Sequence, residues 1–284
     1  MEEEGVAGAL FEEPEDYYKP PAEPTFSTYT RQNGEEVKLR LVGSHPLWGH
    51  LVWNAAKIIS THFEEHVPLE NKFVLELGAG AALPSLVALK LGAQVVVTDY
   101  PDEDLMENIE FNVKANTSEE ERKRVKITGH LWGSSVLPLL SADTGSSEAA
   151  EPRKFDVIIL SDLIFNHSQH QQLLQTCNEA LREEGGQVFV SFSHHRPQWA
   201  QRDLQFFKQA VQPPFCFDVK HLFSTRVGPM FEEDFGSEDV RSTVHVLVLT
   251  RSGSKDRCGS LELPPFAFVP PPPSASSAAE EETK

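Results

Sequence analysis

Residues 73–85 read FVLELGAGAALPS, an apolar strand that runs into a glycine turn and then into the start of a helix. Gly78 and Gly80 let the backbone pass close to a ligand, where a side chain would collide with it. A dinucleotide site would normally place a third glycine three residues after Gly80, and this chain has Leu83 there. The turn favours a nucleoside without a pyrophosphate, although a tight turn that only packs on its neighbour would use the same glycines.

Seven short β-rich runs alternate with helix-like stretches along the chain. They cover residues 73–77, 94–98, 125–131, 155–160, 187–192, 215–223 and 243–250. The early runs are continuously apolar, which predicts an α/β fold with a mostly parallel, Rossmann-like sheet and helices on both faces. The last two runs lack a helix-like stretch between them, so one antiparallel strand is expected at the sheet edge. A seven-stranded sheet with one reversed strand is the architecture of class I methyltransferases.

The second run ends in an acidic residue, Asp99, which lies 21 positions after Gly78. A carboxylate at this point can accept hydrogen bonds from both hydroxyl groups of a ribose. Asp99 could instead cap the helix that opens at Pro101. The preceding glycine turn favours ribose binding.

The fourth run, residues 155–160, is followed by a polar stretch. Ligands of open α/β sheets bind beyond the carboxyl ends of the strands. A methyl acceptor is therefore expected near a set of five residues: Ser161, Asp162, Phe165, Asn166 and His167. The next run ends in Ser-His-His-Arg, residues 193–196, and could form a second wall of the same pocket. The histidines lack the spacing of a metal motif, so no metal is predicted.

Two tryptophans lie outside the strand pattern. Trp53 opens a helix before the first strand of the sheet, and Trp132 follows the third. Either could belong to the core, as large aromatic side chains usually do. Trp132 comes at the carboxyl end of a strand beside Gly133, where an indole can lie against an adenine ring, and this interpretation is favoured.

The net charge of the 284-residue chain is −18, from 25 basic and 43 acidic residues. This charge disfavours a nucleic-acid partner and favours a basic protein. No apolar run approaches the roughly 18 residues that span a bilayer, so no membrane contact is predicted. The N-terminus has neither a basic n-region nor an apolar h-region, which predicts a cytoplasmic protein.

Composition divides the chain into three parts. Residues 1–36 form an acidic arm rich in proline and aromatic residues, 37–252 the expected S-adenosylmethionine-dependent methyltransferase domain, and 253–284 a tail rich in Pro, Ser and Glu that is expected to be disordered. Aromatic residues between prolines can clamp an extended segment onto a domain. We therefore expect the arm to dock through Phe26 and Tyr29.

With these motifs the chain resembles the family-16 protein methyltransferases, through Trp53, the turn at residues 76–80, Asp99, Trp132 and the segment 162–165, which looks like the D-x-x-Y/F motif of that family. Residues 11–16, 47–50, 98–101, 162–167 and 193–197 are similar to fungal members that methylate translation elongation factor 1-alpha. Ala81 and Ala82 depart from the family's common Gly-Ala-Gly-Thr-Gly turn, whose first three residues are intact.

The resemblance implies S-adenosyl-L-methionine as the cofactor and S-adenosyl-L-homocysteine as its product. The cofactor contacts that it implies are Trp53, Gly78, Ala79, Gly80, Asp99, Trp132 and Ser161. The acceptor site that it implies lies near Asp162, Phe165, Asn166 and His167. The substrate implied is the N-terminal α-amine and the adjacent lysine of translation elongation factor 1-alpha.

Two other functions are compatible with the sequence. Some members of the family have carried the label of nicotinamide N-methyltransferase, so a small-molecule amine methyltransferase is one alternative. A non-catalytic module that binds S-adenosylmethionine and recruits a basic partner is another. The complete set of cofactor motifs favours an enzyme.

Overall fold

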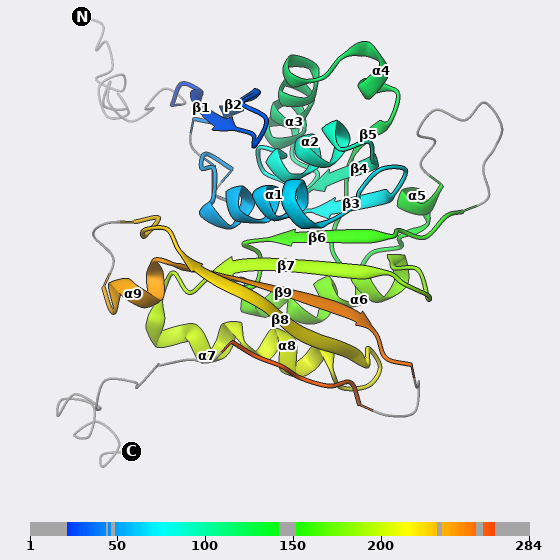
Figure 1. The fold of residues 1–284 in the computed structure, drawn as a ribbon, viewed down its shortest axis with the longest axis vertical. Coiled ribbons are helices and arrows are strands. Elements are labelled where there is room, and N and C mark those ends of the chain that lie inside the picture. The colour runs from blue at the N-terminus through cyan, green and yellow to red at the C-terminus, as the bar shows by residue number, and fades with distance from the viewer. Residues whose placement is uncertain are drawn as a thin grey trace, which may run out of the picture.

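The computed structural model describes residues 22–43, 45–46, 49–141, 152–231, 235–253 and 258–264. The acidic residues at the start of the predicted arm and the polyproline run of the predicted tail lie outside these described residues. Figure 1 shows a central sheet with helices on both of its faces. None of the described helices is long and apolar enough to cross a lipid bilayer.

The central sheet has seven strands in the order β5-β4-β3-β6-β7-β9-β8. They are β3 (Phe73–Leu77), β4 (Gln94–Asp99), β5 (Val125–Gly129), β6 (Val157–Ser161), β7 (Gln187–Ser193), β8 (Phe217–Arg226) and β9 (Thr243–Arg251). Each overlaps its predicted range, and β3 to β7 pair in parallel. The predicted fold class is confirmed.

The position of the reversed strand needs one correction. The strand β9 pairs antiparallel with both β7 and β8, so the reversed strand lies one place inside the edge. The edge strand β8 runs in the common direction. After β8 the chain returns through α9 (Glu238–Arg241), and β9 then pairs with the backbone groups of both β8 and β7, which leaves β8 at the edge.

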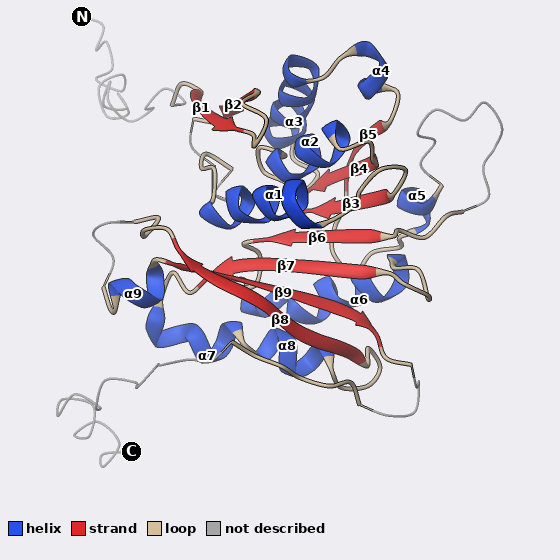
Figure 2. Cartoon of the chain, in the orientation of Figure 1, coloured by secondary structure: helices blue, strands red, loops and turns tan. Residues whose placement is uncertain are grey.

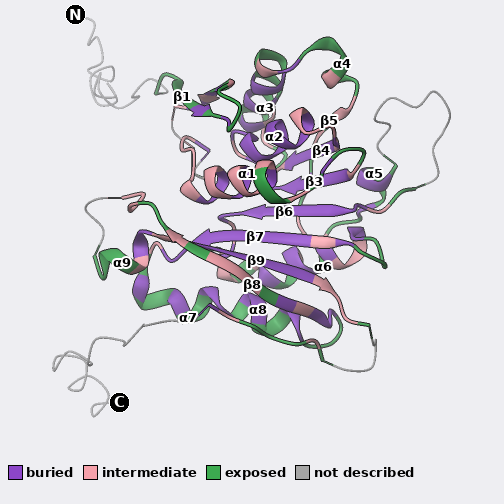
Figure 3. Cartoon of the chain, viewed as in Figure 1, coloured by how far each residue is buried: buried purple, intermediate pink, exposed green. Residues whose placement is uncertain are grey.

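Two hydrophobic cores lie on the two faces of the sheet. Along β3, Val74 packs into one core, whereas Leu75 and Leu77 pack into the other, as the alternation of a strand requires. The first core is covered by α1 (Asn54–His66), α2 (Leu83–Lys90) and α3 (Glu103–Asn116), and the second by α5 (Leu137–Leu140), α6 (His170–Ala180) and α8 (Gln205–Ala210) (Figure 2). Figure 3 shows that the central strands are buried almost throughout.

The helices are mostly short. They are α1 (Asn54–His66), α2 (Leu83–Lys90), α3 (Glu103–Asn116), α4 (Glu119–Arg122), α5 (Leu137–Leu140), α6 (His170–Ala180), α7 (Ala200–Asp203), α8 (Gln205–Ala210) and α9 (Glu238–Arg241), with 3-10 turns η1 (His167–Gln169) and η2 (Pro197–Trp199).

The strands β1 (Thr25–Thr30) and β2 (Glu36–Leu41) form a separate antiparallel hairpin, which spans the predicted boundary at residue 36. Tyr29 is buried, and its hydroxyl is 3.0 Å from both Oγ1 of Thr61 and Oε2 of Glu64 on α1. Phe26 is 69% exposed and contacts only the edge of Phe111 among the described aromatic rings. Of the two aromatic residues expected to dock the arm, Tyr29 is the one that is buried.

Three asparagines of α3 fix the hairpin to the domain. Asn112 is fully buried, and its side-chain amide accepts from the N–H of Arg40 (2.7 Å) and donates to the Arg40 carbonyl (2.8 Å). Asn116 makes the same pair of bonds with the backbone of Lys38, and Asn108 donates to the Arg40 carbonyl as well. The asparagines lie on one helix face because they are spaced by four residues, and they bind alternate residues of β2.

Residues 258–264, which belong to the predicted tail, lie against the edge of the sheet. The N–H of Val219 in β8 donates to the carbonyl of Ser260 (2.8 Å), and the N–H of Glu262 donates to the carbonyl of Val219 (2.9 Å). An edge strand exposes unpaired backbone groups, and this segment covers some of them.

We expect Asn112→Ala to lower the free energy of unfolding by about 1–3 kcal/mol, because it removes the buried acceptor of the Arg40 N–H. Urea unfolding followed by circular dichroism measures this change. Glu107→Ala, at an exposed position of the same helix, is the control and should change the free energy by less than about 0.5 kcal/mol. Equal effects of the two substitutions would show that the asparagine contacts do not hold the hairpin.

Candidate functional site

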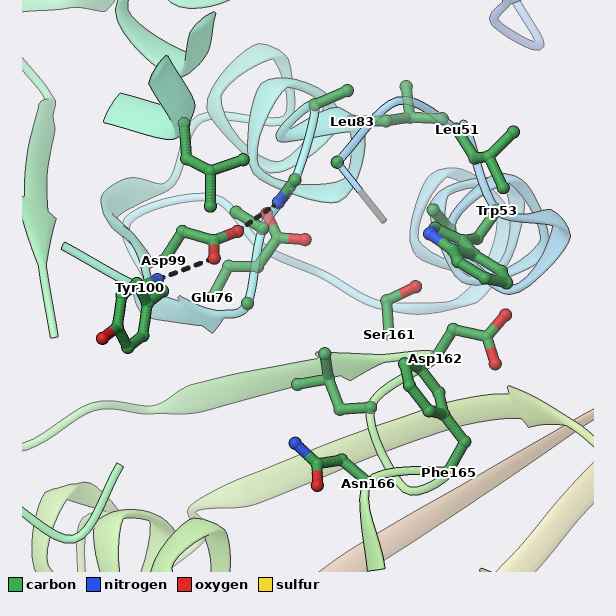
Figure 4. A pocket seen from close by; sticks show the side chains of 18 of the residues that line it. Leu51, Trp53, Glu76, Leu83, Asp99, Tyr100, Ser161, Asp162, Phe165 and Asn166 are labelled. Carbon is green, nitrogen blue, oxygen red and sulfur yellow. Dashed lines mark hydrogen bonds between the residues drawn. The ribbon is translucent and has the colours of Figure 1, made fainter. Parts of the chain in front are cut away.

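One large pocket opens at the carboxyl ends of β3, β4 and β6, with a volume of about 640 Å³. All seven predicted cofactor contacts line it, namely Trp53, Gly78, Ala79, Gly80, Asp99, Trp132 and Ser161. Of the four predicted acceptor residues, Asp162, Phe165 and Asn166 line it and His167 does not. Figure 4 shows Asp99 at one end of the pocket and Trp53, Asp162 and Phe165 toward the other.

The glycine turn, residues 78–80, lines the pocket between these two ends. Gly78 and Gly80 both have left-handed backbone conformations, with φ of +62° and +55°. A Cβ atom on Gly78 would lie 2.6 Å from Cδ2 of Leu163 and 3.3 Å from the Trp132 ring. A Cβ atom on Gly80 would meet no atom within 4 Å, so the space above this residue is open. Gly78 is needed for packing, and Gly80 leaves room for a ligand.

Asp99 ends β4 and holds the glycine turn. Its Oδ2 accepts the N–H of Gly80 (2.6 Å), and its Oδ1 accepts the N–H of Tyr100 (2.7 Å) (Figure 4). Burial raises the pKa of Asp99, and these two backbone hydrogen bonds oppose the rise. The N-cap of α3 is Asp102, which accepts from the N–H of Leu105, so Asp99 is not the helix cap.

Glu76 is a pocket residue that sequence reasoning did not single out for a role. It lies within β3 and is almost completely buried, and Oε2 accepts from both the N–H and the hydroxyl of Ser85 on α2. Burial raises the pKa of Glu76 to about 8, and the bonds from Ser85 oppose this rise. The signal in the sequence is an acidic residue inside an otherwise apolar strand.

Two polar groups at the other end of the pocket are buried without a hydrogen-bond partner among the described residues. They are the hydroxyl of Ser161 and Oδ2 of Asp162. The Asp162 side chain is only 2% exposed, and its backbone has a φ of +55°, which is unusual for a residue with a side chain. Buried polar atoms are nearly always satisfied in folded proteins. These two atoms are therefore the unsatisfied polar groups of the described residues at this end of the pocket.

His167 is held away from the pocket. Its Nε2 is 2.6 Å from Oδ1 of Asp203, and the other oxygen of Asp203 is 2.6 Å from Nδ1 of His194. Burial raises the pKa of Asp203 to about 7, and His167 opposes the rise through its hydrogen bond and its charge. This network joins the loop after β6 to α7. His167 therefore supports the pocket wall from behind.

Within the described part of the chain, no group of His, Cys, Asp or Glu side chains is arranged to hold a metal ion.

Comparison with known proteins identifies the family. A family model described as lysine methyltransferase matches residues 44–212. The protein N-terminal and lysine N-methyltransferase EFM7 of Kluyveromyces lactis is 43% identical over 267 residues, which cover 86% of this chain and 96% of that protein. The protein of the same name from Candida albicans is 42% identical and covers 87% of this chain and 97% of its own length.

The chain belongs to the lysine methyltransferase family. A solved putative methyltransferase complexed with SAH has the same fold, with a TM-score of 0.52 at 12% identity over 82% of this chain and 58% of that one. The protein described here, as a member of the lysine methyltransferase family, is an enzyme that depends on S-adenosylmethionine. Its pocket lies where open α/β folds bind their ligands, beyond the carboxyl ends of the strands.

We expect Glu76→Gln to change how the stability of this methyltransferase depends on pH. The pKa of Glu76 is raised from 4.5 to about 8, so the folded chain holds an extra proton between these values. The stability that this proton confers is fully present below pH 4.5 and is lost as pH rises through the folded pKa. In this window the free energy of unfolding falls by at most about 1.4 kcal/mol per pH unit. Gln keeps the oxygen that faces Ser85 and does not titrate.

The measurement is the free energy of unfolding of both proteins from about pH 5 to about pH 8. The free energy of the variant minus that of the wild type should increase with pH. Glu110→Gln, at an exposed position on α3, is the control and should show no such trend. A constant difference for Glu76→Gln would mean that Glu76 is already ionised in the folded protein.

Proposed function

We propose that this enzyme methylates the N-terminal α-amine and the adjacent lysine of a protein, translation elongation factor 1-alpha, in the cytoplasm. The relatives that match most of the chain are named as protein N-terminal and lysine N-methyltransferases, which supports both kinds of amine as acceptors. The net charge of −18 suits a basic protein substrate. The single observation that carries the proposal is the buried, unpartnered carboxylate oxygen of Asp162 beside aromatic rings in the pocket.

The residues around the glycine turn fit S-adenosylmethionine. The open space above Gly80 allows a ligand to approach the backbone, and the Asp99 carboxylate can accept hydrogen bonds from ribose hydroxyl groups in addition to its two backbone bonds. Trp132 is partly buried and lines the same cavity, where its ring can cover an adenine. When bound, the cofactor supplies a methyl group on a positively charged sulfonium.

The acceptor end must hold an amine in line with that methyl group. Asp162 can accept a charge-assisted hydrogen bond from an ammonium group through Oδ2. The ring of Phe165 lines the pocket and favours a positive charge at its face. The bound ammonium group must first lose a proton, because only the neutral amine has the lone pair that accepts the methyl group. Alignment of the two reacting groups supplies much of the acceleration in such a transfer, so few residues need to take part chemically. Asn166 lines the same wall and can orient the acceptor by hydrogen bonding.

Asp99→Ala should weaken S-adenosylmethionine binding by on the order of 3 kcal/mol, or roughly a hundredfold in Kd, because two charge-assisted hydrogen bonds are lost. Titration calorimetry on the folded variant measures this loss. Asp102→Asn is the control, since Asp102 caps α3 and does not line the pocket, and it should bind normally. An unchanged Kd for Asp99→Ala would remove Asp99 from the ribose site.

The substrate is tested with purified elongation factor 1-alpha and with nicotinamide as separate acceptors. We expect mass spectrometry to locate methyl groups on the α-amine and on the adjacent lysine of the factor, with no turnover of nicotinamide. Acetylation of the α-amine should abolish methylation there and leave the lysine reactive. Methylation of nicotinamide without methylation of the factor would overturn the protein substrate. Tight cofactor binding without any transfer would favour the non-catalytic module.

A further inference from the structure

Four rings from distant parts of the chain meet beside Asp162. Trp53, the N-cap residue of α1, stacks on Phe165 with ring centroids 6.1 Å apart and planes at 26°. The ring of His195, after β7, lies 5.0 Å from the Trp53 ring. The ring of Phe231, which follows β8, lies 5.9 Å from Trp53 and 6.1 Å from His195. Trp53 therefore belongs to the same wall as Phe165.

His195 also fixes the carboxylate. Its Nε2 is 2.9 Å from Oδ1 of Asp162, and the N–H of Ser193 is 3.4 Å from the same oxygen. The His195 side chain is only 10% exposed. Both contacts engage one oxygen of Asp162, and the other oxygen, Oδ2, has no hydrogen-bond partner among the described residues. The left-handed backbone of Asp162 is a strained conformation that such contacts can maintain.

The segment that carries Phe231 is anchored on both sides. The side-chain amide of Asn54, the first residue of α1, donates to the carbonyl of Gly228 (3.1 Å). Nη1 of Arg241, a buried residue at the end of α9, donates to the carbonyl of Phe231 (2.6 Å). These bonds hold the ring of Phe231 against Trp53. Phe231 lies outside residues 44–212, which the family model matches.

We propose that His195 and Phe231 are positioning residues for a subsite that binds a primary amine. His195 orients Asp162 through its hydrogen bond, and Phe231 holds Trp53 through its ring contact, while Asp162 and Trp53 line the pocket. The inference rests on the proposed function, because it takes the acceptor to be an ammonium group. A cation that lies against an aromatic face and is held by one carboxylate oxygen is bound in one orientation. The α-amine and the lysine side chain both end in a primary amine, so one such subsite can serve both acceptors.

The test compares kcat, the acceptor KM and the S-adenosylmethionine Kd of matched variants, with elongation factor 1-alpha as the acceptor. For Phe231 the variants are Phe231→Leu, Phe231→Tyr and the control Phe235→Leu, because Phe235 belongs to the same connection and is 91% exposed. We expect Phe231→Leu to lower kcat/KM at least tenfold while the Kd of S-adenosylmethionine stays within twofold. Phe231→Tyr keeps a ring and should stay within threefold, and Phe235→Leu should have no effect.

For His195 the variants are His195→Ala, His195→Gln and the control His66→Gln, at an exposed position at the end of α1. His195→Ala should lower kcat/KM at least tenfold with the cofactor Kd unchanged. His195→Gln keeps an N–H that can reach Asp162 and should recover a large part of the loss. Thermal unfolding checks that each variant is folded, and the conservative variants carry the test if His195→Ala or Phe231→Leu does not fold.

The results separate this inference from the function on which it rests. If the wild type methylates the factor and the variants keep normal acceptor kinetics, the subsite is wrong and the proposed function stands. If His195→Ala and Phe231→Leu weaken cofactor and acceptor binding alike, the two residues support the fold and the inference is also overturned. If the wild type methylates only nicotinamide, the proposed function fails and the inference fails with it.

Discussion

The hydrogen bond between the Asp99 carboxylate and the N–H of Gly80 is the interaction on which the pocket depends. It joins the end of β4 to the turn after β3, with 2.6 Å between the Gly80 nitrogen and Oδ2 of Asp99. A second bond, from the N–H of Ala79 to the carbonyl of Thr98 (3.0 Å), fixes the same turn. Both glycines of the turn adopt left-handed conformations, which a glycine adopts without steric cost. The backbone is therefore held open in one shape before any ligand arrives, and less conformational entropy is lost on binding.

The order of the strands then divides the pocket into two ends. In the sheet β3 lies between β4 and β6, so residues that follow β4 and β6 lie on opposite sides of the glycine turn. Asp99 ends β4, and Asp162 follows β6. A cofactor that extends across the turn from Asp99 would present its far end to Asp162 and the aromatic rings (Figure 4). The strand order reverses at β3, because β4 and β5 follow on one side of it and β6 and β7 on the other, and open α/β folds bind ligands at such a switch point.

Local motifs were enough to predict the fold and most of the pocket, and long-range contacts decided the rest. The strand runs, the glycine turn and Asp99 are short patterns whose geometry is set by neighbours in sequence. The placement of His167 depends on Asp203, which is 36 positions away. The contact of Phe231 with Trp53 depends on anchors at both ends of its segment. The reversed strand β9 was predicted, but its place inside the edge depends on pairing with β7, which the sequence pattern does not encode.

The division of the pocket is tested most directly by an experimental structure of the enzyme with S-adenosylhomocysteine bound. We predict that the ribose hydroxyl groups lie within hydrogen-bond distance of the Asp99 carboxylate, with the adenine against Trp132. The sulfur should face Oδ2 of Asp162 and the ring of Phe165. A nucleoside bound at the Trp53 and Phe165 end, with Asp99 free of the ribose, would contradict the account.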